Sequence, residues 1–268
     1  MNIKRYREIF GKMPNVIRPK TFNEKMQRRI LFDRNPRLVV FSDKLQARGF
    51  VQSRMGNDEL LPTLYAIVDS PAEISHLNLP LKFVMKSNHG SGMVEIFKDS
   101  SAIPPGELEA LASEWLRRNF FDSTQEWAYK NIRSRIMFEE LLEADGEVPD
   151  DYKLFCFDGE PRFLYVAKDR LVKLKTNFYD LNMNQLPVSV EVEGHVVDNF
   201  PEKIEAPPNF DRMLAIARRL SEGIDFVRVD LYNLGGRIRF GELSVYCANG
   251  LMKCNPPEWD LKFGSYWK

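Results

Sequence analysis

The feature that most constrains the fold is a pair of predicted strands near the C-terminus, 226–232 and 238–245. They are separated by a short glycine-containing segment, which is typical of a β-hairpin. Successive side chains of a strand point to opposite faces, so a slip of one residue moves every side chain to the other face. The register of this hairpin therefore decides which of its polar residues face one another.

Two registers of the hairpin are possible. A two-residue turn at Gly235–Gly236 would pair Asp230 with Gly241 and place Glu242 on the apolar face. A loop with an odd number of residues, for example 235–237, pairs Asp230 directly with Glu242. This second register keeps the valines and leucines of both strands together on one face. We therefore predict the longer loop and the Asp230–Glu242 pair.

Opposed carboxylates on one face of a hairpin repel each other unless a cation lies between them or one is protonated. Magnesium takes oxygen ligands, few of them from the protein and the rest from water and phosphate groups. The pattern thus predicts a metal site at Asp230 and Glu242, with Ser244 on the same polar face. The alternative is a solvated face on which Arg228 neutralises the pair.

A second candidate site is a lysine followed by a loop with two glycines. The run 81–86 is predicted as a buried strand that ends in Lys86, and the loop reads Asn88, His89, Gly90, Ser91 and Gly92. An ammonium beside bare backbone N–H groups is suited to phosphate oxygens. The spacing matches neither Walker A nor the nucleophile elbow. An ordinary flexible turn is the alternative, and for His89 a loop-capping role and a catalytic role both stay open.

A third group of charged residues follows in the middle of the chain. Lys153 and Arg170 could present cations to phosphates or to an acidic substrate, although a charged strand face in water would look the same. An acidic residue near a nucleotide often binds ribose hydroxyls. The acidic residues here are also compatible with an exposed connection: Glu139, Glu140, Glu143 and Glu147.

The remaining pattern predicts an α+β protein. A capping box at Thr21 begins a helix, and further helices are expected over 42–55, 106–120 and 209–223. Buried or alternating strands are expected over 135–142, 152–157 and 161–167, the last two forming a hairpin. The polar, proline-containing segment 176–206 is predicted to be rich in loops.

Composition restricts the function further. The 268 residues contain 38 basic and 38 acidic residues, which gives no support for a nucleic-acid surface or a polybasic membrane surface. The three cysteines are too few and too unevenly spaced for a disulfide framework. The N-terminus leads into no apolar signal segment, and no apolar run is long enough to span a membrane. We therefore expect a cytoplasmic protein.

The order of these segments resembles that of the ATP-grasp superfamily. Their residues resemble more specifically the TupA-like ATP-grasp family of teichuronopeptide biosynthesis. The matching segments span nearly the whole chain: 21–25, 43–44, 82–92, 151–157, 227–232 and 240–243. The resemblance implies two α+β lobes that clamp ATP. A helical N-terminal region would cover 1–80, the first lobe 81–142 and the second lobe 143–268.

The resemblance also implies roles for individual residues. Lys86 and the loop would hold phosphates, and the backbone of the 138–142 linker, including Glu139, Glu140, Leu141 and Leu142, would meet adenine. Either Asp151 or Glu147 would bind ribose, and Lys153 and Arg170 would face phosphate or acyl-phosphate oxygens. Asp230 and Glu242 match the magnesium ligands. The family's Glu-x-Asn pair is here Glu242-Leu243-Ser244, with Asn249 further on, so a hydroxyl stands at the second position.

These assignments predict an ATP- and Mg²⁺-dependent carboxylate–amine ligase that acts through an acyl phosphate. The expected substrates are a carboxylate and an amine, either small molecules or a cell-surface polysaccharide or peptide-polymer precursor. One alternative is a kinase acting on a glycan or another hydroxylated acceptor. The other is a nucleotide-binding subunit without turnover. A glycosyltransferase is disfavoured because no clear Asp-x-Asp motif is present.

Overall fold

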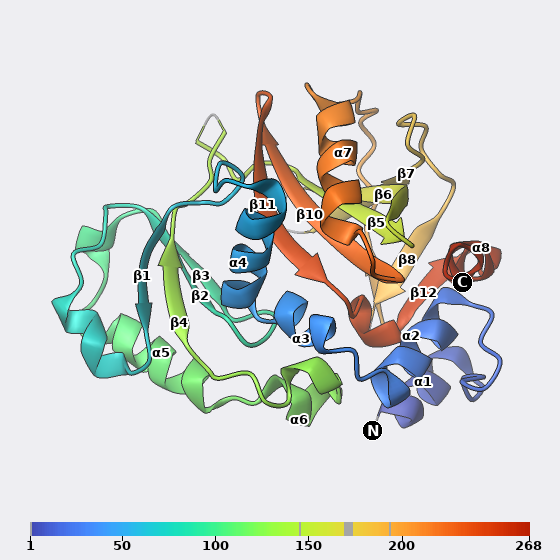
Figure 1. Cartoon of the computed structure of the whole chain (residues 1–268), viewed down its shortest axis with the longest axis horizontal. Helices are drawn as coiled ribbons and strands as arrows, with labels where there is room; N and C mark the ends of the chain where they lie inside the picture. The colour runs from blue at the N-terminus through green and yellow to red at the C-terminus, as the bar shows by residue number, and fades with distance from the viewer. Residues whose placement is uncertain (1, 145, 169–173, 193) are drawn as a thin grey trace.

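The computed structural model describes residues 2–144, 146–168, 174–192 and 194–268. In these residues the chain forms two large antiparallel sheets and a smaller third one, with helices between and around them (Figure 1). The α+β class predicted from the sequence is therefore confirmed. Short helical elements connect the larger ones: α6 (Phe120–Thr124), η2 (Ser100–Ala102), η3 (Trp127–Tyr129) and η4 (Ala248–Gly250).

The first sheet has the strand order β1-β4-β2-β3. Its strands are β1 (Leu64–Val68), β4 (Ile136–Glu139), β2 (Phe83–Ser87) and β3 (Val94–Phe97). Helix α5 (Glu107–Arg117) and η1 (Pro71–His76) contribute to a small apolar core with this sheet, centred on Phe83, Phe138 and Trp115. The strand β1 comes from the region before residue 80, which is otherwise mostly helical.

The second sheet has the order β11-β10-β5-β6-β7. Its strands are β5 (Asp151–Phe157), β6 (Glu160–Lys168), β7 (Lys175–Tyr179), β10 (Phe226–Leu234) and β11 (Arg237–Ser244). Helix α7 (Phe210–Ser221) packs on β5, β6 and β10 through its apolar stripe, which includes Met213, Ala217 and Leu220. The predicted hairpin of β5 and β6 is present.

The segment 176–206, predicted to be rich in loops, is irregular over most of its described residues, but it also contains short strands. This segment contributes most of β7 as well as β8 (Ser189–Val192) and β9 (His195–Val197). In the third sheet β8 pairs with β12 (Met252–Asn255), which lies about sixty residues further on. Short strands whose partner is so distant give little periodic signal in their own window, and prolines beside them obscure it further.

Four helices precede the first sheet: α1 (Asn2–Phe10), α2 (Phe22–Phe32), α3 (Pro36–Ser42) and α4 (Lys44–Met55). The predicted capping box begins α2, because the Glu24 backbone N–H donates to the Thr21 hydroxyl while the Glu24 carboxylate accepts from the Thr21 backbone N–H. Helix α4 lies between the two large sheets, whereas α1 and α2 lie beside the C-terminal helix α8 (Glu258–Tyr266) (Figure 1).

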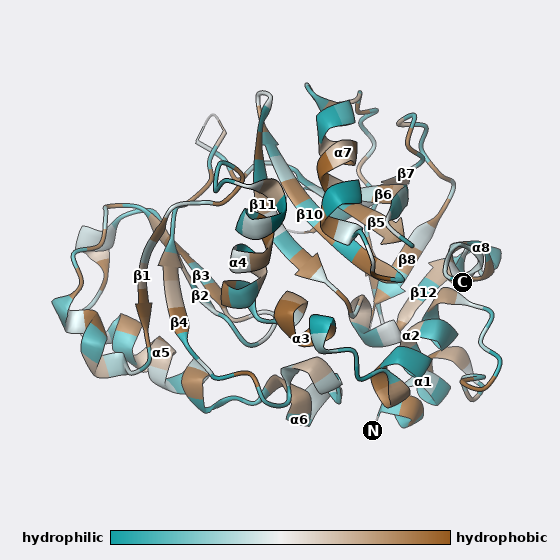
Figure 2. Ribbon diagram, viewed as in Figure 1, coloured by the Kyte–Doolittle hydropathy of each residue, from teal (hydrophilic) through white to brown (hydrophobic). Residues whose placement is uncertain are grey.

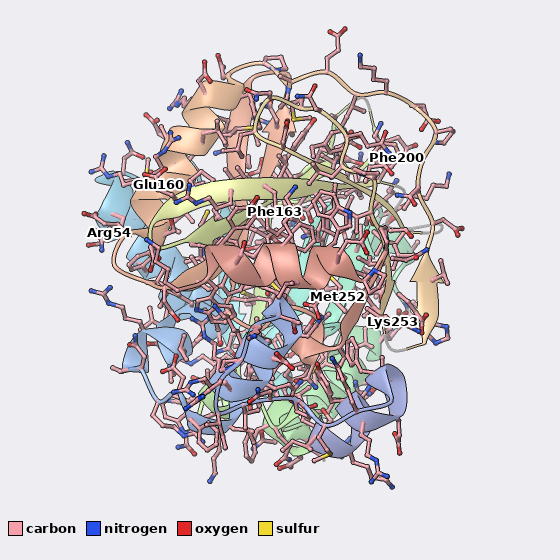
Figure 3. The ribbon with its side chains drawn as sticks, turned by 90° about the vertical axis from the view of Figure 1, so that its right-hand side faces the viewer. Arg54, Glu160, Phe163, Phe200, Met252 and Lys253 are labelled. Carbon is pink, nitrogen blue, oxygen red and sulfur yellow. The ribbon has the colours of Figure 1, made fainter. Side chains whose placement is uncertain are left out.

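The second sheet and α8 share an aromatic core. The rings of Phe163 on β6 and Phe263 on α8 stack with their centres 4.1 Å apart. Figure 3, which faces the right-hand side of the molecule in Figure 1, shows Phe163 just above α8. In Figure 2 brown apolar residues alternate with teal polar ones along β10, and all seven residues of β5 are buried.

The predicted pairing of Asp230 with Glu242 is confirmed, but the predicted loop is wrong. The turn is the tight one, because Leu234 pairs with Arg237 and both Gly235 and Gly236 have positive φ. A bulge between Asp230 and Leu231 then shifts the register by one residue, so that Gly241 has no partner. A Cβ at Gly241 would lie 3.2 Å from the Asp230 carbonyl oxygen, which explains the glycine.

The contact between α8 and the start of α2 provides a test of the packing. A Cβ at Gly264 would lie 2.2 Å from the Lys20 carbonyl oxygen and 2.6 Å from the Phe22 backbone nitrogen, neither of which can rotate away. We predict that Gly264→Ala lowers the free energy of unfolding by about 3 kcal/mol. Gly49→Ala, at an exposed position of α4, meets nothing within 4 Å and should raise it by about 0.5 to 1 kcal/mol. Urea unfolding of both variants checks this, and equal effects would contradict it.

Candidate functional site

A cavity of about 270 Å³ lies between the two large sheets. We call it the central cavity. Its wall is formed by the start of α4, by β2 and β3 of the first sheet, by residues 139–142, 148 and 149, and by β5, β10 and β11 of the second sheet. The predicted site residues in this wall are Lys86, Ser91, Gly92, Glu139, Glu140, Leu141, Leu142, Asp151, Lys153, Asp230 and Glu242.

Three lysines from three different elements line the central cavity: Lys44 on α4, Lys86 on β2 and Lys153 on β5. Lys44 was not predicted as a site residue; its only signal was the Asp43-Lys44 segment of the family resemblance. Its ammonium donates to the Gly90 carbonyl oxygen. Burial lowers the pKa of Lys44, against the opposing effect of Glu242.

Lys86 is held by a buried carboxylate. Its ammonium pairs with Glu139 at the end of β4, whose side chain is 6 % exposed. The other oxygen of Glu139 lies 3.3 Å from the Arg48 guanidinium, and Arg48 also donates to the Pro62 carbonyl oxygen. Two cations thus share one carboxylate, which fixes the direction of Lys86 into the cavity.

Asp230 and Lys153 form the centre of a buried ionic network. Arg228 donates to both oxygens of Asp230, at 2.7 Å each, and Lys153 pairs with Asp230 and, at 2.5 Å, with Asp151. Burial alone would raise the pKa of Asp230, but Arg228 and Lys153 together hold it below its ordinary value. Conversely, burial would lower the pKa of Lys153, and Asp151 and Asp230 raise it instead.

Glu242 is the second carboxylate of the predicted metal site, and it faces Asp230 across the hairpin. Within the described part of the chain its carboxylate forms no hydrogen bond or ion pair. Ser244 lies outside the wall of the central cavity, and its hydroxyl accepts a hydrogen bond of 3.0 Å from Arg228. Asn249 lies further away, where it exchanges two hydrogen bonds with Asn2.

The donor set fits magnesium if the ligand phosphates complete the coordination. No group of three or more metal-ligating side chains occurs among the described residues, so a closed all-protein cage is absent there. Two carboxylates at the cavity wall are what magnesium uses in sites where it also binds nucleotide phosphates. Of these two, Glu242 is available as it stands, while Asp230 is shared with Arg228 and Lys153.

The loop after Lys86, residues 88–92, divides into an anchored half and an open half; we call it the glycine loop. Asn88, His89 and Gly90 are buried, whereas Ser91 and Gly92 are exposed and line the central cavity. The Asn88 side chain donates to Asp43 and to the Arg133 carbonyl oxygen. Asn88 and His89 therefore anchor the loop on the side away from the cavity, and only its tip, Ser91 and Gly92, reaches the cavity.

The segment after β4 places the remaining predicted residues. Leu141, Leu142 and the start of β5 at Asp151 line the cavity, together with the apolar residues Val84, Ile96, Val148, Pro149 and Phe240, which the sequence reasoning missed. Glu147 is exposed and does not line the cavity. Of the two predicted ribose contacts, only Asp151 is therefore in position. Arg170 lies outside the described residues.

The three cysteines do not resemble nucleophiles. All are buried, and burial raises the pKa of the Cys247 thiol to about 11 and those of Cys156 and Cys254 to about 12. A thiol is nucleophilic only as the thiolate. None of the three cysteines lines the central cavity.

The sequence matches the family described as TupA-like ATPgrasp over residues 24–268. The chain belongs to the TupA-like ATP-grasp family. The resemblance drawn from the sequence is thereby confirmed, and with it the ATP-grasp fold. A search of the curated proteins found no match.

Several solved structures of ligases show similarity to the chain. The ligase PsnB in complex with a minimal precursor is 12 % identical, with a TM-score of 0.42, over 79 % of this chain and 54 % of that one. D-alanine–D-alanine ligase from Bacillus anthracis with ATP is 12 % identical, with a TM-score of 0.42, over 78 % of this chain and 55 % of that one. The Helicobacter pylori enzyme is 12 % identical, with a TM-score of 0.45, over 85 % of this chain and 58 % of that one. The chain thus spans little more than half the length of these ligases.

None of the described helices has the length and apolar character needed to cross a membrane.

The ionic network predicts a large effect of removing one of its cations. Arg228→Met leaves the buried Asp230 carboxylate with Lys153 alone, so we expect the free energy of unfolding to fall by about 3 to 5 kcal/mol at pH 7. Because the folded-state pKa of Asp230 is lowered, its ionised form adds stability above its ordinary value of 3.8, and this contribution is lost as the pH falls through the folded-state pKa. The difference between wild type and variant should shrink accordingly in urea unfolding below about pH 4.

Arg218→Met is the matched control for this experiment. Arg218 pairs with Glu160 at 2.9 Å on the surface, where both side chains are about half exposed, and its loss should cost less than about 1 kcal/mol. Similar losses for Arg228→Met and Arg218→Met would mean that the network carries little of the stability.

Proposed function

We propose that the chain is an ATP- and magnesium-dependent carboxylate–amine ligase and that the central cavity is its nucleotide site. The observation that carries this proposal is the meeting of three lysines and the opposed pair Asp230 and Glu242 in one cavity between two sheets. Cations suit phosphate oxygens, and the paired carboxylates suit magnesium. Membership of an ATP-grasp family supports the same assignment.

The base would lie against the apolar part of the cavity. Val84, Ile96, Leu142 and Phe240 offer apolar surface there, and aromatic or aliphatic side chains of this kind typically enclose a ligand ring. The backbone of the 139–142 segment borders the same space, which agrees with the adenine contact that the family resemblance implies. Asp151 is the proposed ribose contact.

The phosphates would lie among the lysines. Lys86, Lys44 and the tip of the glycine loop line one side, and Lys153 lies on the other. Their present partners, Glu139 for Lys86 and Asp151 and Asp230 for Lys153, hold the ammonium groups in place before any ligand arrives. Once bound phosphates have displaced these partners, the lysines would need no further reorientation during the reaction.

Asp230 and Glu242 would hold magnesium, which when bound neutralises charge on the phosphates. Ser244 is left out of this set because Arg228 takes its hydroxyl. Arg228, which lies outside the cavity wall, would keep Asp230 ionised and oriented.

The proposed reaction has two steps. A substrate carboxylate oxygen bonds to the γ-phosphorus while the bond to ADP breaks, and the lysines offset the negative charge that collects on the phosphoryl oxygens. The amine then bonds to the acyl carbon, inorganic phosphate leaves, and the surplus amine proton passes to solvent. No protein nucleophile is needed, in agreement with the buried, protonated cysteines. The predicted role of Arg170 on the acyl phosphate stays a prediction.

The proposed substrate class is a precursor of a cell-surface polysaccharide or peptide polymer. This part of the proposal rests on the family's association with teichuronopeptide biosynthesis and on the need for one carboxylate and one amine.

The proposal is tested by measuring magnesium-dependent release of ADP from ATP with a panel of carboxylates and amines. Lys86→Ala removes a proposed phosphate contact and Glu242→Gln a proposed metal ligand, and each should reduce turnover by about 100-fold or more. Lys82→Ala and Glu147→Gln are the matched controls, because Lys82 pairs with Glu143 on the surface and Glu147 lies outside the cavity. Both controls should keep nearly full turnover.

The product distinguishes the reaction types. A new amide together with inorganic phosphate supports the ligase, whereas a phosphate ester on a hydroxylated acceptor would show a kinase. Full turnover in both Lys86→Ala and Glu242→Gln would overturn the assignment of the site.

A further inference from the structure

The imidazole of His89 is surrounded by hydrogen-bond acceptors. Its Nε2 lies 3.1 Å from the carbonyl oxygen of Trp115 and 3.1 Å from that of Arg118. Its Nδ1 lies 3.3 Å from the side-chain oxygen of Asn88. The ring is 2 % exposed, so water does not compete for these positions.

The orientation of Asn88 is fixed by its own partners. Its Oδ1 accepts from the Arg135 backbone N–H at 2.7 Å, and its Nδ2 donates to Asp43 at 3.0 Å and to the Arg133 carbonyl oxygen at 3.1 Å. In a flipped amide, the Nδ2 donor would face the Arg135 backbone N–H, and the Oδ1 acceptor would face the Arg133 carbonyl oxygen. The atom that faces His89 Nδ1 is therefore an oxygen.

A neutral imidazole satisfies only one side of this environment. It carries one N–H, so one ring nitrogen must present its lone pair to an oxygen. The imidazolium has two N–H groups and donates on both sides. Trp115 and Arg118 stand at the C-terminal end of α5, where the helix dipole also favours a positive charge.

His89 is joined to the part of the loop that lines the central cavity. Gly90 follows it directly, and the Gly90 carbonyl oxygen accepts from the Lys44 ammonium. The loop is closed by the Ser87 N–H, which donates to the Met93 carbonyl oxygen at 3.0 Å, and Ser91 and Gly92 between them reach the cavity. The position of His89 against α5 therefore sets the position of the tip.

Burial opposes the charge. It lowers the pKa of His89, the two carbonyl oxygens raise it, and of the nearby charges Lys44 lowers it and Asp43 raises it. Three further cations nearby have partners of their own: Arg118 pairs with Glu114, and Arg133 and Arg135 with Asp69. Helix α5 also carries Glu107, Glu109 and Arg117. An anionic ligand beside the loop would favour the protonated ring.

We propose that His89 is a positioning residue of the nucleotide site: its protonated ring holds the glycine loop against the end of α5 more firmly than its neutral ring, so that acidification strengthens nucleotide binding. This inference rests on the proposed nucleotide site. By linkage, nucleotide binding must in turn promote protonation of His89.

The experiment measures binding of a non-hydrolysable ATP analogue with magnesium by calorimetry from pH 8 to pH 5. His89→Gln keeps one amide donor but does not titrate, His89→Ala removes the anchor, and His76→Gln makes the same change at an exposed site. We expect the affinities of wild type and His89→Gln for the analogue to agree within about twofold at pH 8. At pH 5 wild type should bind about 3- to 10-fold tighter than His89→Gln. His76→Gln should follow wild type, and His89→Ala should bind more weakly at every pH.

A second measurement follows the His89 imidazole directly by NMR. The chain has three histidines, and His89→Gln identifies the resonance, with exposed His76 and His195 as references. The titration midpoint of His89 should rise when the analogue is added. Identical pH dependence of binding in wild type and His89→Gln, or a ring that stays neutral down to pH 5 with the analogue bound, would overturn the inference. Failure of wild type to bind the analogue at all would instead overturn the proposed function, and this inference with it.

Discussion

The structure depends on how a carboxylate buried in the middle of the second sheet is neutralised. Asp230 is 1 % exposed, and an isolated charge at such a position would be expensive enough to force protonation or unfolding. Arg228 from the same strand and Lys153 from the neighbouring strand remove that cost with short, direct bonds. The same pairing fixes the positions of a lysine and a carboxylate in the cavity wall. Stability and the geometry of the proposed site therefore have one common origin, and the proposed metal ligand is oriented before any metal binds.

The sequence allowed the Asp230–Glu242 pair to be predicted because an apolar core tolerates only one facing of the hairpin. It did not allow the way this facing is reached to be predicted. The chain uses the tight Gly235–Gly236 turn and then corrects the register with a bulge at Gly241, and a pattern of alternating faces cannot distinguish a longer loop from a bulge. Other misses have the same long-range character. Lys44 enters the cavity only because α4 lies between the sheets, and β8 is recognisable only beside β12.

The glycine loop shows how sequence order and role can separate. Its residues form one motif in the sequence, and all were assigned to nucleotide binding from that motif. In the structure the polar residues Asn88 and His89 point away from the cavity into carbonyl and carboxylate acceptors, while the small residues Ser91 and Gly92 form the tip. A backbone that binds phosphate through its N–H groups needs small side chains at the contact and firm support behind it. The division of the loop into an anchored and an open half supplies both.

Each of the three lysines that line the cavity in the described part of the chain already has a partner, and this bears on how a nucleotide could bind. Lys86 shares Glu139 with Arg48, Lys153 shares Asp151 and Asp230, and Lys44 donates to Gly90. A triphosphate would therefore not meet bare charges; it would compete with carboxylates that already hold the lysines. Its advantage is that Arg48 and Arg228 remain behind to neutralise Glu139 and Asp230 when the lysines turn to phosphate. The two arginines lie outside the wall of the central cavity, and their place in the network explains why each carboxylate has a second cation.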